Sequence, residues 1–199
     1  PVLAPLGIGL GVWLILGSAA DIVMRAKGRG VSAGVALKRA LGLPLSIWGS
    51  VLAHIGVGVS VIGIACTAWG LEKIVEMKPG ESVRLAQYEI RLEGGGIRNG
   101  PDYRETFARF VVRENDRVLG ALEPGKRIFT GRTMPTSEAA LMTRGLGQLY
   151  ASIGDMSDGK FAARLYWKPW VLLIWLGAVV MALGGFLSVL DRRARIAAA

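Results

Sequence analysis

The sequence has little of the chemistry on which most enzymes depend. Its 199 residues include one cysteine and one histidine. Cys66 cannot form a disulfide within the chain, and no cysteine-rich metal site is available. The motifs of serine hydrolases (GxSxG), of P-loop nucleotide-binding proteins and of zinc proteases (HExxH) are also missing. These residues therefore do not indicate a hydrolase, a kinase or a cysteine–histidine catalytic pair.

Acidic residues are outnumbered, with 15 Asp and Glu against 24 Lys and Arg, for a net charge of +9. Much of the excess lies in two short stretches. Residues 21–47 hold five basic residues and one acid, and residues 191–199 hold three arginines and one acid. Both stretches flank long apolar runs, as the positive-inside rule describes for cytoplasmic loops. The charge therefore predicts membrane topology, and it does not indicate a nucleic-acid partner.

Three apolar runs, at residues 1–20, 48–69 and 169–190, are each long enough to cross a bilayer as a helix. Since the first residue is Pro1, we expect the chain to start inside a longer protein and its first span to be truncated. Residues 21–47, with some helix before Pro44, and the tail 191–199 are then cytoplasmic. All six tryptophans lie in or beside the apolar runs, which is typical of anchors at the membrane interface.

Residues 70–168 carry dense charge of both signs and alternate apolar with polar side chains, as in half-buried strands. Turn signals such as Asn99-Gly100-Pro101 separate these runs. One segment differs, because Thr136 can cap a short helix with Glu138 in its first turn. The predicted fold class is therefore a membrane protein of transmembrane α-helices, with a β-rich periplasmic domain inserted between the last two spans.

The only histidine, His54, lies inside the second apolar run. An ionisable side chain within the membrane is a functional candidate, and neutral imidazole is a common ligand of haem iron. Its neighbours Gly49, Ser50, Gly56 and Gly58 are small. Small residues would let a flat macrocycle approach the backbone, and they would equally let a second helix pack closely. The histidine could also simply donate a hydrogen bond to a nearby carbonyl, so the residues alone leave its role open.

A second candidate is the basic cluster of Lys126, Arg127 and Arg132. Such a cluster could bind haem propionates or an acidic partner surface. It could equally be a solvated strand edge. The same ambiguity applies to three residues earlier in the chain: Tyr103, Arg104 and Arg109.

Several segments, in this order, resemble the CcmF family of cytochrome c-type biogenesis proteins, which are haem lyase subunits. They are WGSVLAHIGVGVSVIG, GPDYRETFARFVV, KRIFTGRTMPTSEAAL, GLGQLYASIG and ARLYWKPWVLLIWLGAVVMALGGFLSVLDRRAR. The resemblance covers most of the chain and is strongest between Gly100 and Arg195. One departure is Gln148, where the family tends to have Asp.

The resemblance implies a haem-handling protein of the bacterial inner membrane. Family members carry a haem b held by two membrane histidines and help to transfer haem from a haem chaperone to apocytochrome c. His54 stands where the second of these ligands is expected, so the other axial ligand would come from outside this chain. The family's tryptophan-rich haem-presenting segment is not in this sequence, which places catalysis elsewhere.

The implied partners are the haem chaperone, other cytochrome c maturation subunits, apocytochrome c and membrane lipid. A different reading from the residues is a membrane-anchored β-domain that acts only as a docking module, without haem.

Overall fold

The computed structural model describes residues 2–27, 32–131 and 134–197. The chain divides into two compact units, which are described separately. The helical unit contains Pro1–Ala68 and Trp170–Ala199, and the sandwich unit contains Trp69–Pro169.

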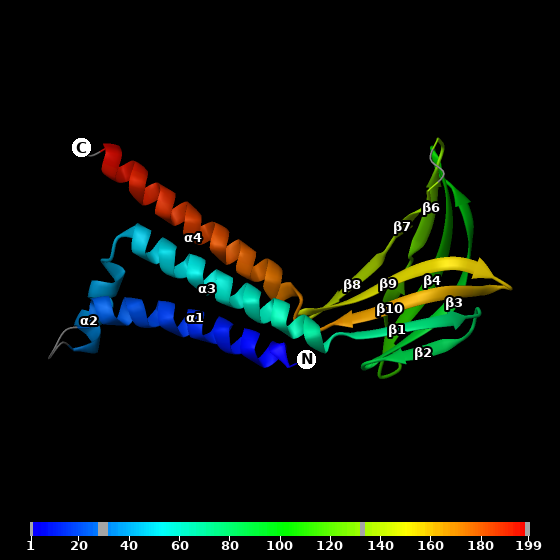
Figure 1. The fold of residues 1–199 in the computed structure, drawn as a ribbon, viewed down its shortest axis with the longest axis horizontal. Helices are drawn as coiled ribbons and strands as arrows, with labels where there is room; N and C mark the ends of the chain where they lie inside the picture. Colours follow the sequence, from blue (N-terminus) through cyan, green and yellow to red (C-terminus); the bar gives the residue numbers. More distant parts are fainter. Residues whose placement is uncertain (1, 28–31, 132–133, 198–199) are drawn as a thin grey trace. The chain divides into compact units, whose positions relative to one another are not determined.

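The helical unit consists of α1 (Leu3–Ala26), α2 (Ala33–Leu41), α3 (Leu45–Cys66), a 3₁₀ turn at Thr67–Trp69, and α4 (Leu172–Ala197). Within this unit α3 lies between α1 and α4 and packs against both (Figure 1). Three stretches are long and apolar enough to span a membrane: Leu3–Ala26, Leu45–Trp69 and Leu172–Asp191. They lie over the three predicted runs, but α1 and α4 each continue by about two turns into the basic stretch that follows.

The helices approach closely because glycines face one another across both interfaces. A Cβ added at Gly56 would lie 2.6 Å from the carbonyl oxygen of Gly177 in α4. A Cβ at Gly58 would lie 2.7 Å from the carbonyl oxygen of Gly11 in α1. Membrane helices associate through such small-residue contacts, since lipid gives them no hydrophobic driving force. Ser60 adds a hydrogen bond across the α3–α4 interface, donating its hydroxyl to the Ile174 carbonyl at 3.1 Å.

The predicted helix in the 21–47 stretch is present as α2. Pro44 precedes α3 with an extended backbone, so the chain turns there before the next helix begins. The indole N–H of Trp48 donates to the Ala40 carbonyl at 3.1 Å, which holds α2 against the start of α3.

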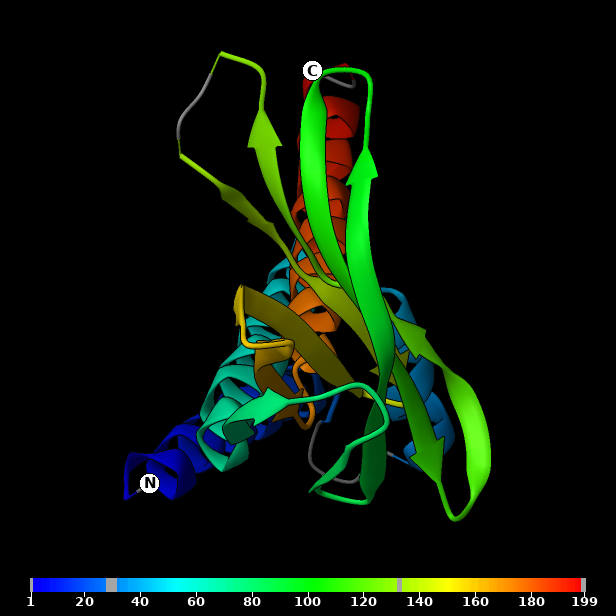
Figure 2. The same cartoon turned by 90° about the vertical axis from the view of Figure 1, so that its right-hand side faces the viewer.

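The sandwich unit is built entirely from antiparallel pairs in two sheets (Figure 2). The four-stranded sheet has the order β1 (Leu71–Met77), β10 (Lys160–Lys168), β9 (Gly147–Ser157) and β8 (Ala140–Arg144). The six-stranded sheet has the order β2 (Ser82–Leu85), β3 (Tyr88–Asn99), β4 (Tyr103–Glu114), β6 (Gly125–Phe129) and β7 (Thr136–Glu138), with β5 (Arg117–Leu122) also paired to β4.

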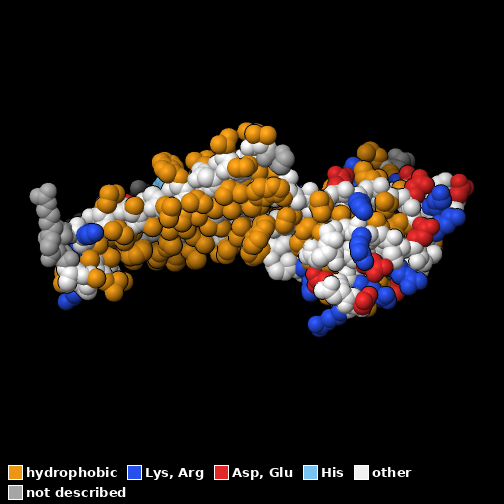
Figure 3. Space-filling view, turned by 90° about the horizontal axis from the view of Figure 1, so that it is seen from below, with side chains coloured by type: hydrophobic (Ala, Val, Ile, Leu, Met, Phe, Trp, Pro, Cys, Tyr) orange, Lys and Arg blue, Asp and Glu red, His pale blue; other side chains and the backbone are white. Residues whose placement is uncertain are grey.

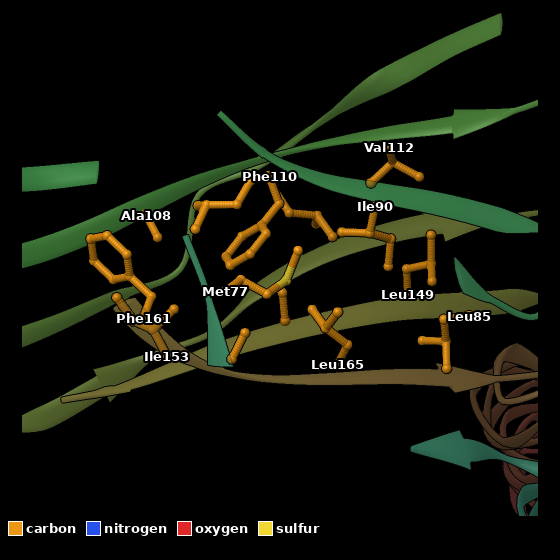
Figure 4. Close-up of a cluster of buried hydrophobic side chains, with 14 of the residues drawn as sticks. Met77, Leu85, Ile90, Ala108, Phe110, Val112, Leu149, Ile153, Phe161 and Leu165 are labelled. Atoms are coloured by element: carbon orange, nitrogen blue, oxygen red, sulfur yellow. The ribbon is translucent and has the colours of Figure 1, made fainter. Parts of the chain in front are cut away.

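The core of the sandwich lies between the two sheets, where alternate residues of each strand point inward (Figure 4). Ile90, Phe110 and Val112 from one sheet meet Leu149 and Leu165 from the other, and all five are almost completely buried. The period-two pattern seen in the sequence therefore corresponds to the inward and outward faces of real strands.

One expectation for this unit is wrong. Thr136 does not cap a helix, because residues 136–138 form β7, which pairs with β6 through contacts such as Arg127 with Thr136. Cross-strand pairing decides the structure here, where the local capping signal is weak. Trp167, expected as an interface anchor, belongs to β10, and its ring packs edge-on against Tyr88 at 5.0 Å.

Candidate functional site

His54 is the tenth residue of the 22-residue helix α3, so it lies near the middle of the span and slightly toward its start. Its side chain is exposed. It shares a stripe of α3, at spacings of three and four residues, with Ser50, Val57, Val61 and Ile64. This stripe differs from the glycine-rich faces that pack on α1 and α4. The exposed imidazole therefore lies outside both of these helix–helix interfaces.

The His54 ring is oriented by a hydrogen bond within its own helix. Nδ1 lies 2.8 Å from the carbonyl oxygen of Ser50, one turn earlier. A carbonyl only accepts, so Nδ1 must carry the proton, which leaves Nε2 of the neutral imidazole as the acceptor. Metal-bound histidines usually donate their other ring nitrogen to a carbonyl or carboxylate in this way. The same contact also satisfies a purely structural histidine, so it is compatible with both roles.

The glycines near His54 serve helix packing and do not make room for a macrocycle. Gly49 and Gly56 face α4, and Gly58 faces α1. Helix packing therefore accounts for these glycines. Of the small neighbours considered, Ser50 alone lies on the stripe that carries His54.

The donor set fits half of a haem site. Histidine is a suitable axial ligand, and its Nε2 has no partner among the residues that the structure describes. A bis-histidine site would need a second imidazole, and this sequence has none. Within residues 2–27, 32–131 and 134–197, no group of three His, Cys, Asp or Glu side chains is placed to hold a metal ion.

The basic cluster is not a free strand edge. Lys126 and Arg127 lie in β6, which is paired on both sides within its sheet. Lys126 forms an ion pair with Asp155, and Arg127 pairs with Glu105 and Glu138. Arg132 lies outside the described residues. The two described members are thus already engaged by carboxylates, which makes them poor candidates for holding propionates.

Glu105 is a buried carboxylate that sequence reasoning missed. Only 1% of its side chain is exposed, although it lies on the outer face of β4, opposite to Phe110. In register, Glu105 faces Arg98 of β3 on one side and Arg127 of β6 on the other. Both guanidinium groups donate to its carboxylate, and the Arg127 bond measures 3.0 Å. Arg–Glu pairs at facing positions of the Asn99-Gly100-Pro101 hairpin could have signalled it.

Opposing effects act on the Glu105 carboxyl. Burial alone raises its pKa, but the hydrogen bonds and positive charges of Arg98 and Arg127 outweigh burial and leave the pKa below its usual value. The carboxylate is therefore ionised at neutral pH. Gly125 stands beside it because any side chain at that position would overlap its oxygen atoms.

On the face seen in Figure 3, hydrophobic side chains cover the helical unit, whereas acidic and basic side chains are interspersed over the sandwich unit. This distribution agrees with helices that meet lipid and a sandwich that meets water.

Comparison with known proteins identifies relatives for both units. Residues 68–169 match the family model described as the CcmF C-terminal beta-sandwich. The chain is 50% identical over 198 residues to the cytochrome c-type biogenesis protein CycK of Bradyrhizobium diazoefficiens, covering 98% of this chain and 30% of that protein. It is 31% identical over 192 residues to the cytochrome c-type biogenesis protein CcmF of Escherichia coli, covering 96% of this chain and 28% of that one.

A solved structure of a protein named Cytochrome c Heme Lyase CcmF has the same fold. It superposes with a TM-score of 0.67 over 94% of this chain and 39% of that chain, at 15% identity. The present chain spans about a third of the length of the curated relatives that it matches.

Proposed function

Because this chain belongs to the CcmF family of cytochrome c-type biogenesis proteins, we propose that it forms part of a haem lyase subunit in the bacterial inner membrane. Its helices would hold one side of a haem b within the bilayer, and the sandwich unit would lie in the periplasm. The protein as a whole would support haem transfer from a haem chaperone to apocytochrome c, together with other maturation subunits.

The observation that carries this proposal is the orientation of the His54 imidazole. Its Nδ1–H is engaged by the Ser50 carbonyl, so the lone pair of Nε2 is directed outward from an exposed stripe of the middle helix. In this orientation His54 would serve as one axial ligand of the haem iron. The second ligand would come from a residue outside this sequence, because the chain has no other histidine.

His54→Gly in the full-length protein tests the assignment. The expected result is loss of the b-type spectrum and of bound haem after purification, with partial recovery when imidazole is added to fill the space. Val57→Ala is the matched control, since Val57 shares the exposed stripe and cannot ligate iron. A variant at His54 that retains the b-type spectrum of the parent protein would refute the ligand role.

The placement of the sandwich unit can be tested separately. A cysteine introduced at Asn99, an exposed residue at the end of β3, should react with a membrane-impermeant maleimide in intact spheroplasts. Labelling only after the membrane is broken would contradict a periplasmic sandwich.

Docking of partner proteins by the sandwich unit is a second candidate, favoured by one observation. Its surface carries a continuous ladder of ion pairs with exposed ends at Glu93 and Glu138. Affinity capture with the full-length protein should lose apocytochrome or the haem chaperone when these carboxylates are replaced by Gln. Unchanged capture would remove support for this surface.

A further inference from the structure

The outer face of the six-stranded sheet carries two rows in which a glutamate stands between two arginines on neighbouring strands. In the first row Glu105 lies between Arg98 and Arg127, and both arginines close onto it. The row is sealed, since Glu105 is 1% exposed. Its carboxylate is paired with both guanidinium groups, so the row leaves no place for a ligand.

The second row has the same charges and the same cross-strand register, but it is open. Arg84 of β2 faces Glu89 of β3, and Glu89 faces Arg113 of β4. Among the described residues, none of these three side chains has a hydrogen bond or an ion pair. The charges of these three side chains are therefore not used within the sandwich and are open to a ligand.

A pocket occupies this row. It has a volume of about 360 Å³ and opens between the β2–β3 turn and the β4–β5 turn, with a lining of Arg84, Ala86, Gln87, Glu89, Arg113, Asn115 and Asp116. Each of its two turns is a two-residue hairpin loop, and the positive φ of +55° at Ala86 and of +61° at Asp116 is what such loops require.

Arg113 shows the need for a partner most directly. Its Nε atom is buried and has no hydrogen-bond acceptor within the described part of the chain. A buried donor without an acceptor is costly, and most such groups in folded proteins are satisfied. An oxyanion in the pocket, with a small rotation of the guanidinium toward it, would remove this deficit.

The lining matches a ligand that carries both charges. Its two guanidinium groups suit a phosphate, which arginine binds through paired N–H donors. Its two carboxylates, Glu89 and Asp116, would repel a simple anion but would hold an ammonium group. The amides of Gln87 and Asn115 add neutral donors and acceptors.

The pocket lies at the end of the sandwich where the chain enters and leaves this unit. Tyr88, next to Gln87, packs against Trp167, and Trp167 in turn pairs with Leu71, the first residue of β1. In the sequence, Leu71 and Trp167 closely border the segments long and apolar enough to span a membrane. A ligand with both a phosphate and an ammonium group is a phosphate ester of an amino alcohol. The nearness in sequence of the apolar spans favours a membrane phospholipid as the source of that ester.

We propose that this pocket binds the headgroup of a zwitterionic phospholipid, phosphatidylethanolamine. Arg84 and Arg113 hold the phosphate, and Glu89 and Asp116 hold the ammonium group. The sandwich unit would thereby bind the bilayer surface at a defined point, through a site that is separate from His54.

The test is calorimetric titration of the purified full-length protein in detergent. The probes are dioctanoyl phosphatidylethanolamine, dioctanoyl phosphatidylglycerol, glycerophosphoethanolamine and inorganic phosphate. The expected order of affinity has phosphatidylethanolamine first. Arg113→Gln should weaken its binding at least tenfold, and Arg91→Gln should not, because Arg91 is an exposed arginine of β3 that does not line the pocket.

Glu89→Gln supplies an independent readout that does not depend on the folding of arginine variants. It is nearly isosteric, and it should reduce the preference for phosphatidylethanolamine over phosphatidylglycerol, because it removes a partner of the ammonium group and also a carboxylate that repels the anionic lipid. Retained affinity in Arg113→Gln, an unchanged preference in Glu89→Gln, or inorganic phosphate binding as tightly as the lipid would each overturn the proposal. Equal binding of glycerophosphoethanolamine would assign the pocket to a soluble phosphate ester and overturn the lipid as its source.

Discussion

Replacing Glu105 by Gln should strongly destabilise the sandwich unit. The amide is nearly the same size as the carboxylate, so packing is conserved and the change isolates the charge. Arg98 and Arg127 would then face one another across a neutral group, close together on strands that flank β4. Breaking a buried ion pair by removing one partner costs about 3–5 kcal/mol, because the remaining charge is left uncompensated.

The structure places the expected cost near the lower end of that range. Glu105 is buried, but 46% of the Arg98 side chain and 28% of the Arg127 side chain are exposed. Water can therefore solvate part of each guanidinium once its partner has gone. We expect a loss of about 3 kcal/mol, which for a domain of this size lowers the melting temperature by roughly 12 °C or more.

The assay is thermal unfolding of the full chain in detergent, followed by near-ultraviolet circular dichroism of the sandwich tyrosines. Glu93→Gln is the matched control. Glu93 pairs with Arg109 on the same sheet, but both side chains are about half exposed, and such surface pairs contribute about 0–1 kcal/mol. If the two variants melted at similar temperatures, the buried carboxylate would not be what holds these strands together.

Three further results are expected. The stabilising effect of Glu105 should depend on pH, because its pKa is lower in the folded protein than in the unfolded one. The stabilisation is complete above the unfolded glutamate pKa of about 4.3 and is lost as the pH falls through the folded pKa. Melting temperatures of the parent and Glu105→Gln proteins, measured over a pH series, should therefore converge in acid. Gly56→Leu should separate α3 from α4 and lower the temperature at which the detergent-solubilised protein aggregates. Gly9→Leu should have little effect, because nothing lies within 4 Å of a Cβ added at Gly9. Equal aggregation temperatures of the two variants would contradict the packing role of Gly56. Trp167→Ala should cost less than the about 3–5 kcal/mol of a buried tryptophan, because Trp167 is only partly buried, and a loss under 1 kcal/mol in urea denaturation would contradict its packing role.

Much of the fold could be predicted because it depends on patterns that are local in the sequence. A run of apolar residues long enough to span the bilayer must form a helix to satisfy its backbone, so α1, α3 and α4 were expected. The alternation in VRLAQYEIRLEG predicted strands β2 and β3 for the same kind of reason, since one face must be buried. The helix before Pro44 was equally local.

The errors arose where a residue's environment depends on distant segments. Thr136 has a capping side chain, yet its backbone pairs with β6. Lys126 and Arg127 suggested a free basic edge, but carboxylates from other strands neutralise them. The glycines around His54 left room for a macrocycle and close helix packing as open alternatives, and only the positions of α1 and α4 show that helix packing accounts for them.

For this protein, the sequence by itself determined that apolar helices flank a β-rich domain, and that one histidine lies within a span. Hydrophobic length and periodicity are properties of a single segment, so no tertiary information was needed. The tertiary structure decided which side of α3 carries His54 and which nitrogen is engaged. It also decided that one Arg–Glu–Arg row is closed around Glu105 while the other, around Glu89, is open. Both rows have the same composition and differ only in how neighbouring strands and turns bring their side chains together.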